Sequence, residues 1–300
     1  MTTRERARRG LFVYFAFVLV FSGVCEGAMI AKGGLISAHP LLAVANMWVP
    51  GFACIFARVA LKEGFGDVSF SIGEKHGSRM LAFGWLTPVL VGLVAYGLAW
   101  TLRLETFAAP PSPNPLVSSR PIFLRFAFSL LLNVSLGTII SAISAGGEEL
   151  GWRGYMLTRL VDAEVPHPVV VSGLIWSAWH LPLIASGLYA AGPHPALSCV
   201  LFVASTTAGG MIAARARLES GSLWPAVAFH SAWNAVIQGT FDRFTLGGDE
   251  ARTTTIWTGE SGILVAAVSV VVALVMAWKA WPARRTPDEE PFAKLDRRTI

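Results

Sequence analysis

The chain has 300 residues, of which 54% are hydrophobic and only 14% are charged, and its mean hydropathy is +0.56. A soluble domain usually carries about 25% charged residues, so this composition excludes an ordinary soluble globular protein and indicates a multispanning membrane protein. The formal net charge of +5 is modest, and the basic residues form no polar, aromatic-studded surface of the kind that binds nucleic acid.

Eight apolar stretches are long enough to cross a bilayer, which requires about 20 residues per helix. In chain order they are 11–31, 37–60, 80–101, 122–145, 168–188, 196–214, 222–240 and 261–281. The first stretch is too long for a signal peptide and no clean cleavage site follows it, so we expect it to remain as a span. The sequence therefore predicts an all-α polytopic membrane helix bundle of about eight transmembrane helices. One integral-membrane domain would cover residues 1–282, and a polar cytoplasmic tail would cover 283–300.

The distribution of basic residues predicts an orientation. An even number of spans places both termini on the same side of the membrane. Eighteen of the 24 Lys and Arg residues fall in segments on that side, and loops rich in these residues are retained in the cytoplasm. We therefore expect a multi-pass protein with both termini in the cytoplasm.

The stretch "ISAGGEELGWRGYML", residues 143–157, places two adjacent glutamates after an apolar run that we expect to continue as a helix. A charge at a helix centre costs roughly 2.5–3.5 kcal/mol in a membrane, so such residues normally face a cavity and carry function. Residues four apart lie about 40° apart around a helix, which allows an ion pair between Glu149 and Arg153. Glu148 lies about 100° away and should point elsewhere. The preceding Gly-Gly pair is expected to bend this helix.

Two further polar groups occur in apolar spans. "LIWSAWHLPL" contains Trp176 and, four residues later, His180, and "WPAVAFHSAWNAV" contains His230 and Asn234 at the same spacing. A single buried histidine is more often structural than catalytic. Two buried histidines that accompany two glutamates and an asparagine favour a functional site, because each of these groups is costly in lipid.

Three motifs in this order resemble those of one family. "EELGWR" matches the pattern EExxxR, "WSAWH" matches FxxxH with Trp176 in place of Phe, and "HSAWN" matches HxxxN/D. The chain is thus similar to the CAAX-protease and bacteriocin-processing (CPBP, or Abi) intramembrane proteases over about residues 140–240. This resemblance implies a catalytic core over about residues 122–240 and a location in a prokaryotic cell membrane.

The resemblance implies hydrolysis of a peptide bond near the membrane surface by a glutamic endopeptidase. Glu148 would activate water as the general base, His180 would help to position that water, and His230 and Asn234 would donate hydrogen bonds to the oxyanion. A carboxylate shielded from bulk water is suited to proton transfer near neutral pH. The expected supporting residues are Glu149, Arg153 and Trp176. Prenylated CAAX-type proteins or bacteriocin-like and signal-like peptides would be the substrates, and membrane lipids the surroundings.

Other chemistries fit the residues less well. Two glutamates and two histidines could bind zinc, but there is no HExxH helix and the three cysteines have no metal-binding spacing, so no metal or other cofactor is expected. Ser144 and Ser231 lie near the motifs but lack the G-x-S-x-G context of a nucleophile. The alternatives are a non-proteolytic scaffold or immunity protein of the same family and a proton-coupled transporter. A transporter would carry charges along several helices, and here Glu26 is the main charge outside the motifs.

Overall fold

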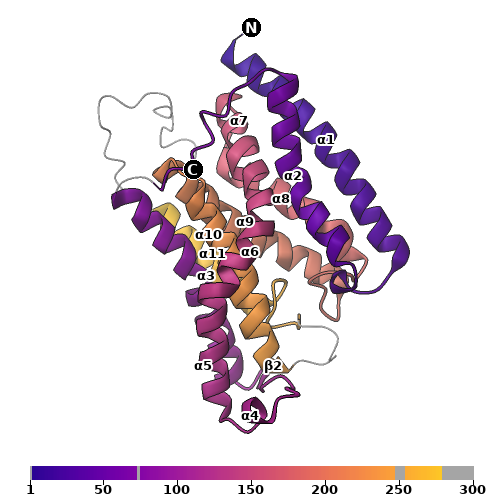
Figure 1. The fold of residues 1–300 in the computed structure, drawn as a ribbon, viewed down its shortest axis with the longest axis vertical. Coiled ribbons are helices and arrows are strands. Elements are labelled where there is room, and N and C mark those ends of the chain that lie inside the picture. The colour runs from indigo at the N-terminus through magenta and orange to yellow at the C-terminus, as the bar shows by residue number, and fades with distance from the viewer. Residues whose placement is uncertain (1, 73–74, 247–253, 279–300) are drawn as a thin grey trace.

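The computed structural model describes residues 2–72, 75–246 and 254–278. Within these ranges the chain forms a bundle of long helices with one short two-stranded ribbon at the end opposite the N-terminus (Figure 1). The polytopic helical bundle predicted from the sequence is therefore confirmed. The predicted tail, 283–300, lies outside the described residues.

Most of the described chain is α-helical. The α-helices are α1 (Thr3–Lys32), α2 (Pro40–Ala60), α3 (Lys75–Thr101), α4 (Pro115–Ser118), α5 (Ile122–Leu132), α6 (Thr138–Gly151), α7 (Leu157–Asp162), α8 (Pro168–Ala185), α9 (Pro195–Ser220), α10 (Trp224–Ala232) and α11 (Ile263–Trp278). Three π-helical segments interrupt or extend them, namely η2 (Asn133–Gly137), η3 (Trp152–Met156) and η4 (Trp233–Phe241). Two 3₁₀ turns are η1 (Ile36–Ala38) and η5 (Asp242–Phe244). The antiparallel strands β1 (Thr106–Phe107) and β2 (Thr245–Leu246) pair Thr106 with Leu246.

Local sequence sets many of the helix ends. Five helices, α2, α4, α8, α9 and α10, have a proline in the first turn, where the missing N–H costs nothing and the fixed φ suits a helix. Helix α1 begins with a reciprocal capping box in which Thr2 and Glu5 each bond the other's backbone N–H. Helix α9 ends at Gly221, whose φ of 67° is a left-handed conformation that glycine adopts without strain.

The glutamates lie on the longest helical segment of the described chain. Elements α5, η2, α6, η3 and α7 follow one another without a break over Ile122–Asp162, which is 41 residues. The predicted continuation of the fourth span into the glutamate segment is confirmed. Helix α6 runs through the Gly146–Gly147 pair with unbroken α-helical assignment. The departures from α-helical hydrogen bonding are instead η2 and η3, and π-helical turns of this kind are frequent at functional sites.

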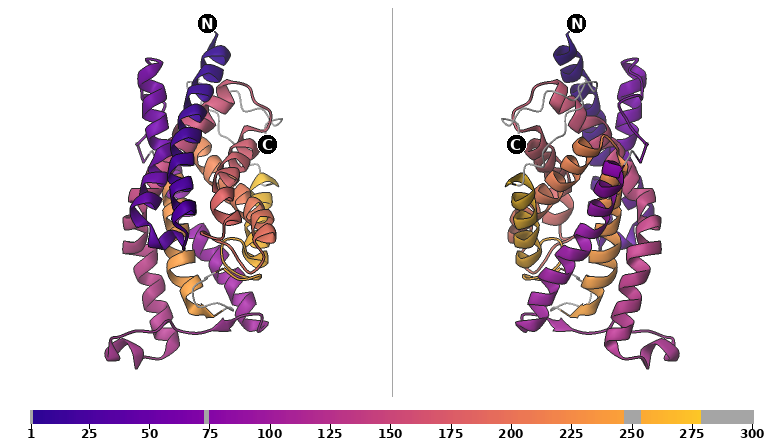
Figure 2. Two further views of the ribbon diagram at one scale, coloured as in Figure 1. Left: turned by 90° about the vertical axis from the view of Figure 1, so that its right-hand side faces the viewer. Right: turned by 90° about the vertical axis from the view of Figure 1, so that its left-hand side faces the viewer.

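Six helices in the described ranges are long and apolar enough to span a membrane, rather than the eight expected from the sequence. The other two predicted spans are helical but do not meet this criterion. Stretch 222–240 corresponds to α10 followed by η4, and stretch 261–281 corresponds to α11, whose described part is shorter. In both side views the long helices run roughly along the vertical axis, as in a membrane bundle (Figure 2).

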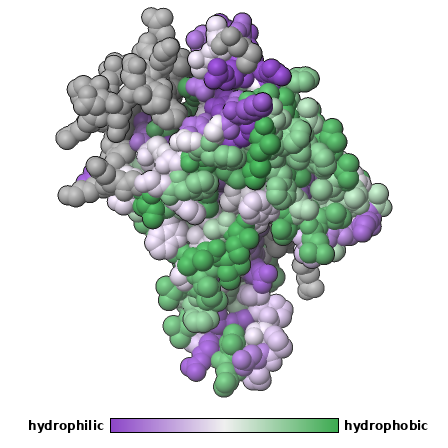
Figure 3. Space-filling model, turned by 45° about the horizontal axis from the view of Figure 1, so that its top comes forward, coloured by the Kyte–Doolittle hydropathy of each residue, from purple (hydrophilic) through white to green (hydrophobic). Residues whose placement is uncertain are grey.

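The distribution of apolar side chains is that of a protein surrounded by lipid. Large apolar residues are widely exposed on the helices, among them Phe12 at 76% and Phe128 at 68%. Apolar residues cover much of the middle of the molecule, and hydrophilic ones gather at the end near the N-terminus (Figure 3). The interior contains charged side chains that are almost fully buried, which is the arrangement expected of functional groups within a membrane.

Glycines allow α6 to lie directly against α2. A Cβ added at Gly51 would be 2.7 Å from the carbonyl oxygen of Gly147, and one added at Gly147 would be 2.7 Å from Cδ2 of Trp48. Small residues permit this close backbone approach, which is typical of membrane helix packing. The contact fixes α6 immediately before the two glutamates.

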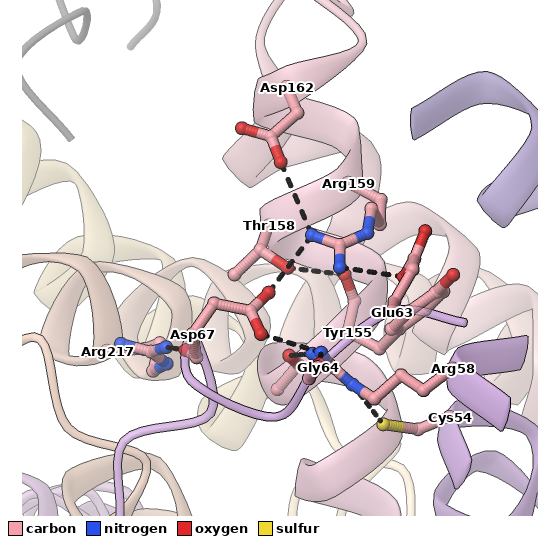
Figure 4. A network of polar contacts seen from close by, with 11 residues as sticks. Cys54, Arg58, Glu63, Gly64, Asp67, Tyr155, Thr158, Arg159, Asp162 and Arg217 are labelled. Carbon is pink, nitrogen blue, oxygen red and sulfur yellow. Dashed lines mark hydrogen bonds and ion pairs between the residues drawn. The ribbon is translucent and has the colours of Figure 1, made fainter. Parts of the chain in front are cut away.

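Arginine side chains bind the connection between α2 and α3 to later helices (Figure 4). Arg58 and Arg159 each contact the Asp67 carboxylate, at 2.6 Å and 3.0 Å, and Arg217 donates a hydrogen bond to the Asp67 carbonyl at 2.7 Å. Arg159 also pairs with Glu63 at 2.9 Å. This network, which we call the Asp67 network, joins α2, α7 and α9 at the end of the bundle where the N-terminus lies.

Candidate active site

The two adjacent glutamates occupy the last turn of α6 and are both buried. Glu148 is 1% exposed and Glu149 is fully buried. Because neighbouring residues on a helix point about 100° apart, the two carboxylates face different neighbours. The structure places them in two separate hydrogen-bond systems, as the helix geometry predicts.

Glu148 is held by two tryptophans. Its Oε2 atom accepts a hydrogen bond from Nε1 of Trp152, on the same helix, at 3.2 Å, and from Nε1 of Trp176, on α8, at 2.9 Å. Both donors are neutral, so this buried carboxylate has no direct cation partner among the described residues. Trp176 therefore does more than pack beside the site, because it fixes the carboxylate.

Glu149 forms the predicted ion pair and also bonds a histidine. Its Oε1 atom lies 2.7 Å from Nη1 of Arg153 and 2.9 Å from Nδ1 of His230. The Arg153 guanidinium also lies over the Trp176 ring, 4.2 Å from its centroid. The pair between α6 and η3 is thus joined to α8 and α10, and His230 belongs to the same buried charge system.

His180 lies on α8 with a defined orientation. Its Nδ1 is 2.9 Å from the Trp176 carbonyl, and because a carbonyl only accepts, Nδ1 carries the proton. In the neutral ring Nε2 is then the free acceptor. The ring packs against Trp179, Tyr189 and Phe202, with centroid separations of 4.7, 5.8 and 5.0 Å.

His180, His230 and Asn234 meet around one cavity of about 30 Å³, which has room for about two water molecules. The full lining consists of Trp176, His180, Tyr189, Phe202, Ser205, Thr206, Gly209, Phe229, His230, Trp233, Asn234 and Glu260. The structure thus brings together the two histidines, the asparagine and the tryptophan that the motifs single out, although they come from α8, α10 and η4.

Glu148 does not itself line this cavity within the described ranges, and no direct hydrogen bond joins it to either imidazole there. Trp176 connects the two parts. Its indole N–H bonds Glu148, and its ring lies edge-on to the rings of His230 and His180, with centroid separations of 5.1 and 5.9 Å. The site therefore has a carboxylate compartment and an imidazole compartment that share one indole wall.

Residues 123–236, which carry all of these groups except Glu260, match the family model described as type II CAAX prenyl endopeptidase Rce1-like. This segment of the chain is thus similar to the Rce1-like family. The family predicted from the three motifs is confirmed, and it supports a membrane protease. No curated protein matches the chain.

The site includes polar residues that the motifs do not indicate. Glu260, in the turn before α11, accepts hydrogen bonds from the Tyr189 hydroxyl, from Nε1 of Trp233 at 2.8 Å and from Nε2 of Gln238 at 3.1 Å. Glu260 lies outside the matched segment. The one feature of the sequence that could have indicated Glu260 is its position directly before an apolar span. A carboxylate there must either reach water or be buried with hydrogen-bond partners.

Other nucleophiles and ligand sets are not assembled among the described residues. Ser144 and Ser231 donate to the carbonyls of Ser141 and Val227 on their own helices, at 3.1 and 2.7 Å. The three cysteines are unpaired, and Cys54 is buried. In the ranges that the structure describes, no group of three or more His, Cys, Asp or Glu residues is arranged to hold a metal ion.

Proposed function

We propose that the chain is an intramembrane endopeptidase in which Glu148 acts as the general base that activates water. The observation that supports this most strongly is a fully sheltered carboxylate, held by two neutral indole N–H groups, beside a water-sized cavity lined by two imidazoles. A carboxylate whose direct side-chain donors are both neutral, in a site of low polarity, is well suited to take a proton from water.

In this proposal His180 positions the attacking water. Its Nδ1–H is committed to the Trp176 carbonyl, which leaves Nε2 as the atom that accepts a hydrogen bond in the cavity. A water held between this nitrogen and the Glu148 compartment could transfer its proton to the carboxylate as it attacks the peptide carbonyl.

His230 and Asn234 supply the donors for the tetrahedral oxyanion. The Glu149 carboxylate accepts from Nδ1 of His230, so it stabilises the protonated ring, in which Nε2–H is also a donor. Arg153 balances the charge of Glu149. Preorganised donors of this kind typically contribute about 100- to 1000-fold in rate.

The proposed substrate is a peptide or the tail of a lipidated protein that reaches the site from the membrane, of either the prenylated CAAX type or the bacteriocin and signal-like type. We place both termini in the cytoplasm and the protein in a prokaryotic cell membrane. The excess of basic residues on the N-terminal side supports this orientation, and the apolar outer surface supports the membrane environment.

The direct test is Glu148→Gln in purified protein reconstituted into liposomes. The amide keeps the shape and the indole contacts but cannot act as the base, so we expect cleavage of a farnesylated CAAX-type peptide to fall to background. Glu26→Gln is the matched control, because Glu26 is also a buried carboxylate, 5% exposed, and bonds Asn46 outside the site. Retained cleavage by Glu148→Gln would defeat the assignment, as would equal loss in Glu26→Gln.

The same preparations separate the alternatives. Full activity after exhaustive chelation, with no metal found by elemental analysis, would eliminate the zinc version. A protein that cleaves neither prenylated nor unprenylated peptides would favour the scaffold or immunity role. Proton flux that depends on Glu148 in the absence of cleavage would favour the transporter.

A further inference from the structure

Glu260 is a buried carboxylate at the cavity that the proposed mechanism leaves without a role. It is 8% exposed and accepts hydrogen bonds from three side chains, Tyr189, Trp233 and Gln238. These donors come from the loop after α8 and from η4, whereas Glu260 precedes α11. One carboxylate therefore ties three separate segments together at the cavity wall.

The backbone around Glu260 is built to present this side chain. The Glu260 carbonyl accepts from the Ser205 hydroxyl on α9 at 2.7 Å, and the N–H of Gly259 donates to the Tyr96 hydroxyl on α3 at 3.0 Å. Gly259 has a φ of 86°, and a Cβ there would lie 2.6 Å from Oγ1 of Thr254. The turn is thus fixed from two helices and requires glycine immediately before the carboxylate.

The first consequence concerns the amide of Asn234. Gln238 donates through Nε2 to Glu260 at 3.1 Å, and the same nitrogen lies 3.5 Å from Oδ1 of Asn234. A carboxylate only accepts, so Glu260 determines that Gln238 presents its NH₂ group on this side. Oδ1 of Asn234 then faces Gln238, and the NH₂ group of Asn234 is left to donate into the cavity.

The second consequence concerns the ring of His180. The Tyr189 ring stacks on it, with centroids 5.8 Å apart and planes inclined by 25°. The Tyr189 hydroxyl donates to Glu260, which fixes the ring that covers His180. Glu260 thus contacts the immediate neighbours of two proposed catalytic side chains and neither of those side chains directly.

We propose that Glu260 is a positioning residue for this site. It orients the Asn234 amide through Gln238, so that the NH₂ group faces the oxyanion, and it holds Tyr189 against His180. The inference rests on the proposed peptidase function. Glu260 positions hydrogen-bond donors that stabilise the transition state, and it does not position residues that bind the ground-state peptide. Its replacement should therefore change the rate of the chemical step.

The first measurement compares kcat and KM for Glu260→Gln on a fluorogenic farnesylated CAAX-type peptide in liposomes. The replacement amide brings its own NH₂ group to three donors, so the orientation of Gln238 is no longer imposed. We expect kcat to fall about tenfold with KM unchanged, as for loss of a group that acts only in the transition state. An unchanged kcat, or a change in KM alone, would overturn the proposal.

A double-mutant cycle distinguishes positioning from general support of the fold. Gln238→Met removes the amide at similar volume, and Asn234→Ala removes the proposed donor. If Gln238 acts through Asn234, Gln238→Met lowers kcat in the wild-type background but by less than about twofold in the Asn234→Ala background. Multiplicative effects of the two changes would overturn the proposal, and they remain measurable even if Glu260→Gln fails to fold.

The controls separate this inference from the proposed function. Wild-type cleavage and its loss in Glu148→Gln are measured first in the same liposomes, and absence of either overturns both proposals. Cleavage that depends on Glu148 but shows no coupling between Gln238 and Asn234 overturns only the role of Glu260. Thermal unfolding of each variant, beside Glu26→Gln, confirms that folded protein is compared.

Discussion

Removal of Arg153 should destabilise the protein more than removal of both members of its ion pair. In Arg153→Met the fully buried Glu149 loses a partner at 2.7 Å, and breaking a buried pair in this way costs about 3–5 kcal/mol. Loss of the cation–π contact with Trp176, at 4.2 Å, adds about 0.5–2 kcal/mol. We therefore expect a loss of about 4–6 kcal/mol in unfolding free energy, taking the middle of these ranges.

The double variant Glu149→Leu/Arg153→Met removes both charges of the buried pair. In this variant Nδ1 of His230 loses the Glu149 acceptor, which lies at 2.9 Å in the wild type. A buried donor left unsatisfied lowers the unfolding free energy by about 1–3 kcal/mol. The double variant should therefore be more stable than Arg153→Met alone, although it carries one more substitution. Its activity should stay low, because His230 is no longer held.

The assay is equilibrium unfolding in mixed detergent micelles, followed by tryptophan fluorescence. The wild type, Arg153→Met, Glu149→Leu and the double variant are compared in the same micelle. Adding His230→Phe to the double variant should recover part of the remaining loss of unfolding free energy, because it removes the buried N–H donor that has no acceptor. A double variant that is destabilised by the sum of the two single effects would refute this account of Glu149, Arg153 and His230 as one charge system.

Two further outcomes follow from the packing and the charges. Gly147→Ala should lower the unfolding free energy by about 1–3 kcal/mol through overpacking against α2. Gly146→Ala should be neutral or stabilising, because its Cβ would meet nothing within 4 Å. Equal melting temperatures of the two variants would contradict this. Burial raises the pKa of Asp67, but the hydrogen bonds and charges of Arg58 and Arg159 lower it more, so its pKa lies below the ordinary value. Its stabilising contribution is present above the unfolded-state pKa of about 3.9 and is lost as the pH falls through the lower folded-state pKa. The difference in melting temperature between wild type and Asp67→Asn should thus shrink below about pH 4, and a constant difference would contradict the assignment.

The sequence predicts what helix geometry and hydropathy control. The membrane bundle, the Glu149–Arg153 pair at i,i+4, and the separate direction of Glu148 all follow from spacing along one helix. The gathering of His180 with His230 follows from the motifs only by resemblance, since they lie on different helices.

Contacts between helices are what the sequence does not reveal. The Trp176 indole bonds Glu148 because α8 lies beside α6, and a tryptophan in an apolar span has the same pattern whether it packs or donates. Glu260 is missed because its three donors are distant in sequence and none lies at a helical spacing from it. The sequence also does not reveal that, of the paired glycines, Gly147 serves the close approach of α2 to α6.

The Asp67 network has a consequence for the order in which the chain assembles. Asp67 is synthesised 92 residues before Arg159 and 150 residues before Arg217, and both partners arrive on later helices. The contacts of Asp67 with Arg159 and Arg217 therefore cannot form until α7 and α9 have been made, so the connection after the second helix gains its last partner only when most of the bundle has been synthesised.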